Sequence, residues 1–168
     1  NSSDIFSIDF INSAYIDLEI VDSKISSFDL GKMLPNLKTN YDESWLVNTN
    51  IKGYLNDLFI ENLLLENKNN TINFNSNIKN IFHDNYSLTF DVINFDINSE
   101  EIDRVFPKFF GTLLPSSLKT FGRFKMDGYV DFKTDYVSSK FNLIINQGLL
   151  KSDLKIFNFS NIDNASYD

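Results

Sequence analysis

The one imidazole in the chain, His83, stands beside Asp84 and is the only candidate base for a Ser-His-Asp triad. It falls between two stretches with strand periodicity, where we expect a turn. An imidazole in such a turn is normally hydrated. We therefore predict that His83 is a solvent-exposed loop residue and not a catalytic base.

Three carboxylates, Asp127, Asp131 and Asp135, could suggest a cation site. Asp127 and Asp131 would share one face of a strand, whereas calcium loops need acids grouped on a turn with a Gly. We predict an outward polar face at these positions, with no metal and no cofactor. No spacing among the remaining Asp and Glu residues indicates the carboxylate pair of a glycosidase. We therefore expect no enzyme activity.

The composition excludes further classes of function. The 168 residues include no Cys, which removes disulfides, thiolate zinc sites and cysteine nucleophiles. With 23 acidic against 15 basic side chains the net charge is −8, which argues against nucleic-acid binding. No apolar run approaches the ~20 residues of a membrane-spanning helix. The chain starts without Met or a signal peptide, so we expect a segment of a longer protein, folded as a single unit.

The chain is rich in Phe, Ile and Tyr and has only two Ala, Ala14 and Ala165, a composition that favours strands. Apolar and polar residues alternate with a period of two, as in residues 71–78 and 86–92. This pattern predicts strands over 4–10, 14–22, 45–54, 57–65, 71–81, 86–97, 121–134, 137–146 and 149–159. The polar residues 66–70 are expected to form a hairpin tip, and Trp45 a core position.

Two segments break the strand pattern and predict short helices. Residues 99–106 and 27–34 each follow a capping Ser or Asn and end before a Pro, at Pro107 and Pro35. Residues 25–35 align with 97–107 at an offset of 72, and 53–57 align with 128–132 at an offset of 75. The sequence therefore predicts two related units, at about 15–81 and 86–159, in one array.

Amphipathic strands must hide their apolar side, by packing on a second sheet, closing into a barrel, taking a covering helix or curling into a groove. A β-sandwich, as in a binding or adhesion module of a cell-surface protein, is the alternative to a groove. The period of two predicts a set of apolar side chains on one inner face. These are Leu18, Ile20, Ile72, Phe74, Leu88, Phe90, Val92, Phe124, Met126, Phe141 and Leu143.

Several segments resemble the TamB family of translocation and assembly proteins, in the AsmA-like superfamily. The similar pieces are residues 28–34, which begin Phe-Asp-Leu-Gly, residues 114–128, which begin Leu-Pro, and residues 148–155 and 164–168. Their order and spacing carry the resemblance, which covers most of residues 15–168. The membrane-anchored N-terminus and the C-terminal domain of that family have no counterpart here, so the resemblance is to an internal stretch.

The resemblance implies an all-β, mainly antiparallel sheet curled into a U-shaped apolar groove, called a β-taco. Proteins of this kind span the periplasm of Gram-negative bacteria, from the inner membrane to an Omp85-type barrel protein in the outer membrane. They are implicated in moving phospholipids between the membranes and in assembling outer-membrane proteins. We expect a conduit segment whose lining residues shield lipid acyl chains, since burial is worth about 0.8 kcal/mol per CH₂.

Overall fold

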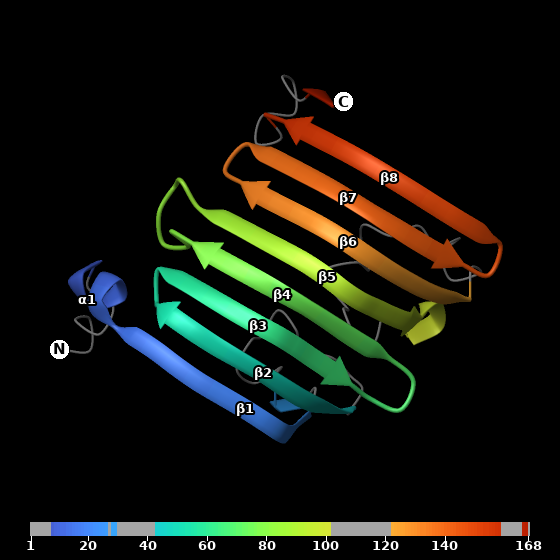
Figure 1. The fold of residues 1–168 in the computed structure, drawn as a ribbon, viewed down its shortest axis with the longest axis horizontal. Coiled ribbons are helices and arrows are strands. Elements are labelled where there is room, and N and C mark those ends of the chain that lie inside the picture. Colours follow the sequence, from blue (N-terminus) through green and yellow to red (C-terminus); the bar gives the residue numbers. More distant parts are fainter. Residues whose placement is uncertain (1–7, 27, 30–42, 102–121, 159–165, 168) are drawn as a thin grey trace.

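The computed structural model describes residues 8–26, 28–29, 43–101, 122–158 and 166–167. They form one antiparallel sheet whose strand order in space is the order in the chain (Figure 1). The strands are β1 (Tyr15–Ser26), β2 (Ser44–Tyr54), β3 (Asp57–Glu66), β4 (Thr71–Lys79), β5 (Ser87–Asn98), β6 (Arg123–Lys133), β7 (Tyr136–Ile145), β8 (Gly148–Phe157) and the two-residue β9 (Ser166–Tyr167).

Two short helical elements accompany the sheet. Helix α1 (Ile8–Ser13) precedes β1, so the strand expected over 4–10 is wrong for its described part. The apolar spacing of Ile8 and Ile11 fits one helical turn, and Ile11 is buried beside β2. The 3₁₀ helix η2 (Ser99–Glu101) falls within the helix expected at 99–106. Residues 28 and 29, in the other expected helix, are helical, and the Asp29 amide donates to Ser26 Oγ. The remainder of both segments lies outside the described residues.

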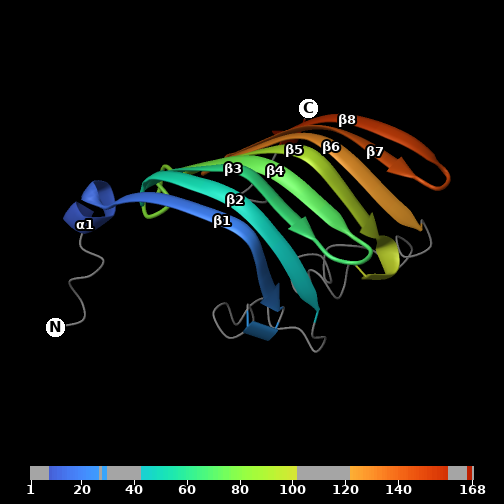
Figure 2. The same cartoon turned by 60° about the horizontal axis from the view of Figure 1, so that its bottom comes forward.

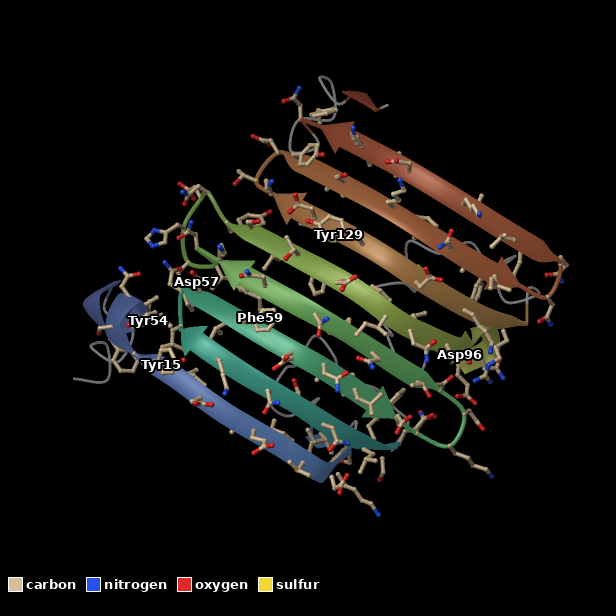
Figure 3. All side chains as sticks on the ribbon, in the orientation of Figure 1. Tyr15, Tyr54, Asp57, Phe59, Asp96 and Tyr129 are labelled. Atoms are coloured by element: carbon tan, nitrogen blue, oxygen red, sulfur yellow. The ribbon has the colours of Figure 1, made fainter. Side chains whose placement is uncertain are left out.

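The eight long strands match the periodicity of the sequence because each has one apolar and one polar side. Paired residues of neighbouring strands share a face, so the register assigns every strand residue to a side. We call the side that carries Leu18 and Phe90 the apolar face and the opposite side the polar face. The polar face, viewed in Figure 3, carries charged pairs such as Lys52 with Asp17, and also aromatic rings at Tyr15, Tyr54 and Phe59.

A line of β-bulges crosses the sheet and bends it. The register shifts at Ile20/Ser23 in β1, Ile60/Leu63 in β3 and Val92/Phe95 in β5, at positions that lie opposite one another. Asp22 and Asn62, inside the first two bulges, adopt positive φ angles of 46° and 51°. Their backbone N–H groups donate to side-chain oxygens on the next strand, Asn48 Oδ1 at 2.7 Å and Asn75 Oδ1 at 2.8 Å. Bulges add bend and twist to a strand, so this line explains the arch in Figure 2.

The arch is shallow, and the sheet is neither closed nor strongly curled (Figure 2). The described strands do not by themselves form the U-shaped groove that the sequence led us to expect. They also form no second sheet, so the β-sandwich is absent from the described part of the chain. The bulges bend the strands along their own length, which is the bend that a groove running from β1 to β8 requires. The bend is too small to bring the two ends of the strands toward each other (Figure 2).

Candidate functional site

All eleven apolar residues expected on one face do lie on one face of the sheet. The pairing joins Leu18 to Ile51 and Ile51 to Ile60, and continues across each hairpin to Phe141 and Leu143 on β7. Each bulge adds one residue to β1, β3 or β5, and the alternation of apolar and polar residues shifts by one position at the same point. The apolar residues after each bulge therefore lie on the same face as those before it. The polar-face residues labelled in Figure 3 lie on the outer side of the arch that Figure 2 shows, so the apolar face is the inner side.

The bulge line divides the apolar face into two parts that differ in burial. We call the part beyond the line, at the carboxyl ends of β1, β3 and β5, the core end. Its central cluster is Trp45, Val47, Ile72, Ile97 and Phe124, all less than 9% exposed. Eight partly buried side chains pack against this cluster, among them Phe74 and Leu143. Trp45 is thus a core residue, as its place in an apolar strand predicts.

The other part, which we call the open end, has apolar side chains of which none is fully buried. Its members are Ile16, Leu18, Ile51, Leu58, Ile60, Ile78, Leu88, Phe90, Val130, Phe132, Val137, Leu154 and Ile156. Leu18 is 44% exposed, and Phe132 and Leu154 are each 36% exposed. No described element packs over this part, because the described strands contact mainly their neighbours in the sheet. Apolar surface that stays in contact with water costs solvation free energy unless something covers it.

Three aromatic rings connect the two parts of the apolar face. Phe74 and Phe90 meet edge to face with ring centroids 5.7 Å apart, and Phe90 meets Phe132 in the same way at 6.3 Å. Phe90 is therefore the central ring of a row that crosses from β4 to β6. Edge-to-face packing fixes the ring positions and leaves part of each ring surface open toward the inner side.

A few polar side chains interrupt the apolar face near its middle. Thr49, Ser76 and Ser139 are 6%, 2% and 7% exposed, which makes them buried hydroxyls among apolar neighbours. Thr49 Oγ1 donates to the Glu61 carbonyl at 3.1 Å, whereas Ser76 Oγ has no hydrogen-bond partner among the described atoms. Small hydroxyls leave room beside the rings without introducing charge. These three positions follow the period of two of their strands. A prediction of lining residues that selects apolar types leaves them out.

The eleven expected lining residues divide between the two parts of the face. Ile72 and Phe124 are buried in the core end, and Leu18 is exposed at the open end. The other eight are half-buried. The search of the sequence missed several members of the open end, chiefly Leu58, Ile60, Val130, Phe132 and Leu154. All have the same period of two, so extending the pattern to every strand could have found them.

The polar candidates lie apart from the apolar face. His83 is an exposed turn residue between β4 and β5, and its backbone N–H donates to the Asn80 carbonyl at 2.8 Å. Asp127 and Asp131 share the polar face of β6, where Asp127 accepts from Asn142 at 2.8 Å. Asp131 is only 8% exposed and pairs with Lys133 at 3.0 Å, so it is more buried than an outward polar face implies. Among the described residues no three His, Asp or Glu side chains are grouped to hold a metal ion.

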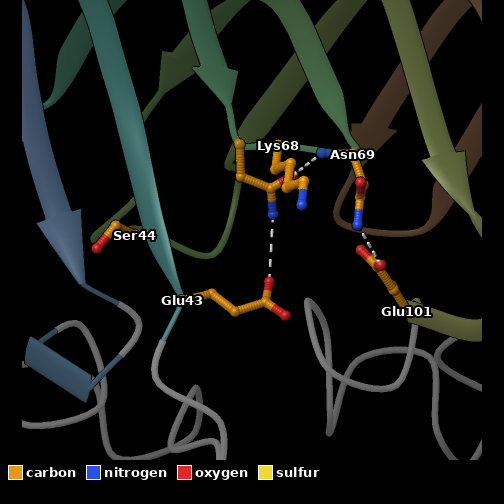
Figure 4. Close-up of a pocket in the computed structure, with 6 residues that line it drawn as sticks. Glu43, Ser44, Lys68, Asn69 and Glu101 are labelled. Atoms are coloured by element: carbon orange, nitrogen blue, oxygen red, sulfur yellow. Dashed lines mark hydrogen bonds between the residues drawn. The ribbon is translucent and has the colours of Figure 1, made fainter.

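A shallow open pocket of about 240 Å³ lies at the tip of the β3–β4 hairpin, lined by Glu43, Ser44, Asn67, Lys68, Asn69 and Glu101 (Figure 4). Its polar groups are bonded to one another. Glu101 accepts from Asn69 Nδ2 at 2.7 Å and from Asn70 Nδ2 at 2.6 Å, and Glu43 accepts from Asn67 Nδ2 at 3.2 Å. These bonds tie the hairpin tip to the end of β5 and the start of β2, which is a structural role.

No protein-family model, curated protein or solved structure matches this chain. Within the residues that the structure describes, no helix is long and apolar enough to span a membrane.

Proposed function

We propose that this sheet is one wall of a lipid conduit, in a TamB- or AsmA-like protein that shields acyl chains between the inner and outer membranes. The observation that carries the proposal is the open end of the apolar face. It offers half-buried or exposed aliphatic and aromatic side chains on every strand from β1 to β8, from Leu18 on β1 to Leu154 on β8.

The dimensions and chemistry of the face support an acyl chain as its occupant. Strands spaced about 4.8 Å apart give roughly 34 Å from β1 to β8. That exceeds the ~15 Å of acyl chain in one leaflet, half of the ≈30 Å hydrocarbon layer. Apolar contacts are non-directional, so a chain can slide across equivalent side chains without a barrier at each one. In this proposal the U-shaped groove is completed by further strands, and the protein acts in the periplasm with an Omp85-type barrel partner. It also supports outer-membrane protein assembly.

The test is lipid capture by the 168-residue protein and two matched variants. Lipids are extracted from the purified protein for mass spectrometry. The protein is also irradiated with a diacyl phospholipid that carries a diazirine in one acyl chain. We expect labelled peptides to contain Leu88, Phe90 or Phe132. We expect Phe90→Asp to lower labelling about tenfold, since burying a Phe side chain is worth about 1.5–3 kcal/mol and 1.4 kcal/mol is tenfold.

The control places the same change on the other side of the sheet. Phe59 is mid-strand on the polar face of β3, 45% exposed and paired with Lys52. Phe59→Asp should leave both folding and labelling unchanged. Unfolding of Phe90→Asp alone, measured by circular dichroism and protease resistance, would show that Phe90 is a packed core residue and would contradict an open lining at this position. Equal labelling of all three proteins would contradict the conduit.

A further inference from the structure

Three aromatic rings are exposed on the polar face, the side of the sheet that the proposed conduit does not use. Tyr54 on β2, Phe59 on β3 and Tyr129 on β6 are 49%, 45% and 43% exposed (Figure 3). All three belong to interior strands, which are paired on both sides. Their exposure is therefore a property of the face and not of the edges of the sheet. Exposed apolar surface gathered in one region marks an interaction site.

The three rings follow one another across the sheet. Tyr54 pairs with Asp57, two residues before Phe59, so the first two rings are diagonal neighbours, roughly 7–8 Å apart. Tyr129 is three strands beyond Phe59, about 14 Å away across the strands. Tyr15 packs edge-on against Tyr54, with ring centroids 5.4 Å apart, and so helps to fix the first ring in place.

Polar side chains separate the rings. The register places Asn77 beside Phe59 and Asp91 beside Tyr129, and Thr89 lies between them on β5. Hydrogen-bonding groups therefore stand next to each ring. We call the three rings, Asn77, Thr89 and the six charged side chains around them the outer patch. The charged members are Lys52, Asp57, Lys79, Asp91, Asp131 and Lys133.

The outer patch is electrically balanced, with three Lys and three Asp, in a chain whose net charge is −8. Lys133 Nζ bonds the Asp131 carboxylate at 3.0 Å, and Asp57 is paired with Lys79 on the next strand. A surface without net charge complements an uncharged partner, whereas a polyanion such as nucleic acid requires a basic surface. Charge complementarity therefore favours an uncharged ligand here.

The shape of the surface favours a polymer over a small molecule. Small molecules bind in concave pockets that enclose most of their surface. The outer patch is on the convex side of the arch, where a ligand is contacted from one side only (Figures 2 and 3). A polymer makes up for this by contacting several points at once. The patch extends from β2 to β6, roughly 19 Å, which accommodates several units of an extended chain.

We propose that the outer patch binds an uncharged, extended polysaccharide. A sugar ring has an apolar C–H face and a rim of hydroxyls. The C–H faces stack on Tyr54, Phe59 and Tyr129. The hydroxyls exchange hydrogen bonds with exposed charged groups between these rings, such as Asp57 and Asp91. A protein partner needs a desolvated apolar centre, which the intervening polar side chains of this patch interrupt. The site is on the face opposite the lipid lining, so it does not rest on the conduit.

Affinity electrophoresis of the 168-residue protein tests the proposal. In a native gel at neutral pH the acidic chain migrates toward the anode, whereas an uncharged polysaccharide cast into the gel stays in place. The probes are hydroxyethyl cellulose and glucomannan, each over a concentration series, with an acidic reference protein of similar size that binds neither. We expect both polysaccharides to slow this protein relative to the reference, and the concentration dependence gives the dissociation constant.

Two ring variants and two controls locate the site. Phe59→Thr and Tyr129→Thr keep a residue type that suits strands, and each should raise the dissociation constant about tenfold, or 1.4 kcal/mol. Tyr129→Phe keeps the ring and should bind like the unaltered protein. Ile144 is 49% exposed on the same face, at the other end of the strands, so Ile144→Thr should leave binding unchanged. Circular dichroism checks that each variant is folded.

Two results would overturn the proposal. One is migration of the unaltered protein that neither polysaccharide slows. The other is equal slowing of the unaltered protein, both ring variants and Ile144→Thr, which would show sieving by the gel in place of binding at the rings. Lipid labelling of Phe59→Thr is measured in parallel and should be unchanged, because the lining is on the opposite face. Failure of one test therefore leaves the other proposal standing.

Discussion

At the scale of single residues, Asp131 is a buried carboxylate with one of its two oxygens unpaired among the described atoms. Its carboxylate lies on the polar face yet is 8% exposed, and Oδ2 bonds Lys133 Nζ at 3.0 Å while Oδ1 has no partner among the described atoms. Lys133 in turn lies 5.7 Å from the Tyr136 ring centroid. The hydrogen bond to Asp131 raises the pKa of Lys133. Burial, and then the charge of Asp131, raise the pKa of Tyr129.

Removing the Asp131 charge should therefore lower both pKa values. We expect Asp131→Asn to move the Tyr129 titration toward the ordinary pKa of 10.0, measured as tyrosinate absorbance near 295 nm and assigned by subtraction of Tyr129→Phe. Asp127→Asn, on the same strand and face, is the control and should leave the Tyr129 titration in place. An unchanged midpoint in Asp131→Asn would contradict the charge coupling.

The same pKa shifts set a pH window for stability. Both groups bind their protons more tightly in the folded state, because both pKa values are raised on folding. Their contribution to stability is therefore complete below about pH 10, the ordinary pKa of tyrosine. It is lost as the pH rises through the folded-state pKa values. Denaturation midpoints at pH 8 and pH 11 should thus differ less in Asp131→Asn than in the unaltered protein.

At the scale of strands, Gly128 allows β6 and β7 to lie close together. Its φ of 148° is in the region that favours glycine, and an added Cβ would lie 2.3 Å from the Lys140 carbonyl oxygen and 2.6 Å from Phe141 Cα. Both contacts are to backbone atoms, which cannot move aside without shifting the strand. Gly148, at the start of β8, has open space where its Cβ would be.

We expect Gly128→Ala to destabilise the protein by about 1–3 kcal/mol, the cost of a residue held in a sparsely populated conformation. Gly148→Ala should be neutral or slightly stabilising, since the change mainly reduces the freedom of the unfolded chain. Urea denaturation of both variants gives the comparison. Similar midpoints for the two would show that β7 moves away from β6 at little cost.

The strands themselves could be predicted from the sequence because period-two alternation persists through all eight of them. The strand expected over 4–10 failed at Ile8–Ser13, where too few residues remained to tell a period of two from a helical turn. The bulges were also missed, although Asp22 and Asn62 are of the types that adopt positive φ most readily. Without them, the shared apolar face could be predicted, but neither the arch nor the division of that face into a core end and an open end.

At the scale of the whole molecule, the sheet is close to one-dimensional. Strand order follows chain order, and each described strand packs mainly on its two neighbours. Stability in such arrays is a sum of nearest-neighbour terms, so the ends are held less firmly than the middle. The sequence predicts two related units, at about 15–81 and 86–159. The bulges of β1 and β5 recur at the expected offset of 72, whereas β2 and β6 start 79 residues apart and not at the offset of 75 expected from residues 53–57 and 128–132.

Hydrogen exchange should show directly that the strands at the ends of the sheet are less stable than those in the middle. We expect amides of β3 to β6 to exchange most slowly and those on the outer edges of β1 and β8 most rapidly, because interior strands are paired on both sides. Mass spectrometry at several protein concentrations gives the measurement. Edge protection that persists at high dilution would contradict this difference in stability.

The order of the strands also determines how the protein would respond to tension. Helix α1 and strand β9 lie at opposite edges of the sheet, so a force between them acts across the strands (Figure 1). Such a force opens one pair of strands at a time, like a zipper, and never loads all the backbone hydrogen bonds together. Each ten-residue strand that detaches releases about 35 Å of chain. The sheet would therefore yield in small steps at low force, and so act as an extensible element when its ends are pulled apart.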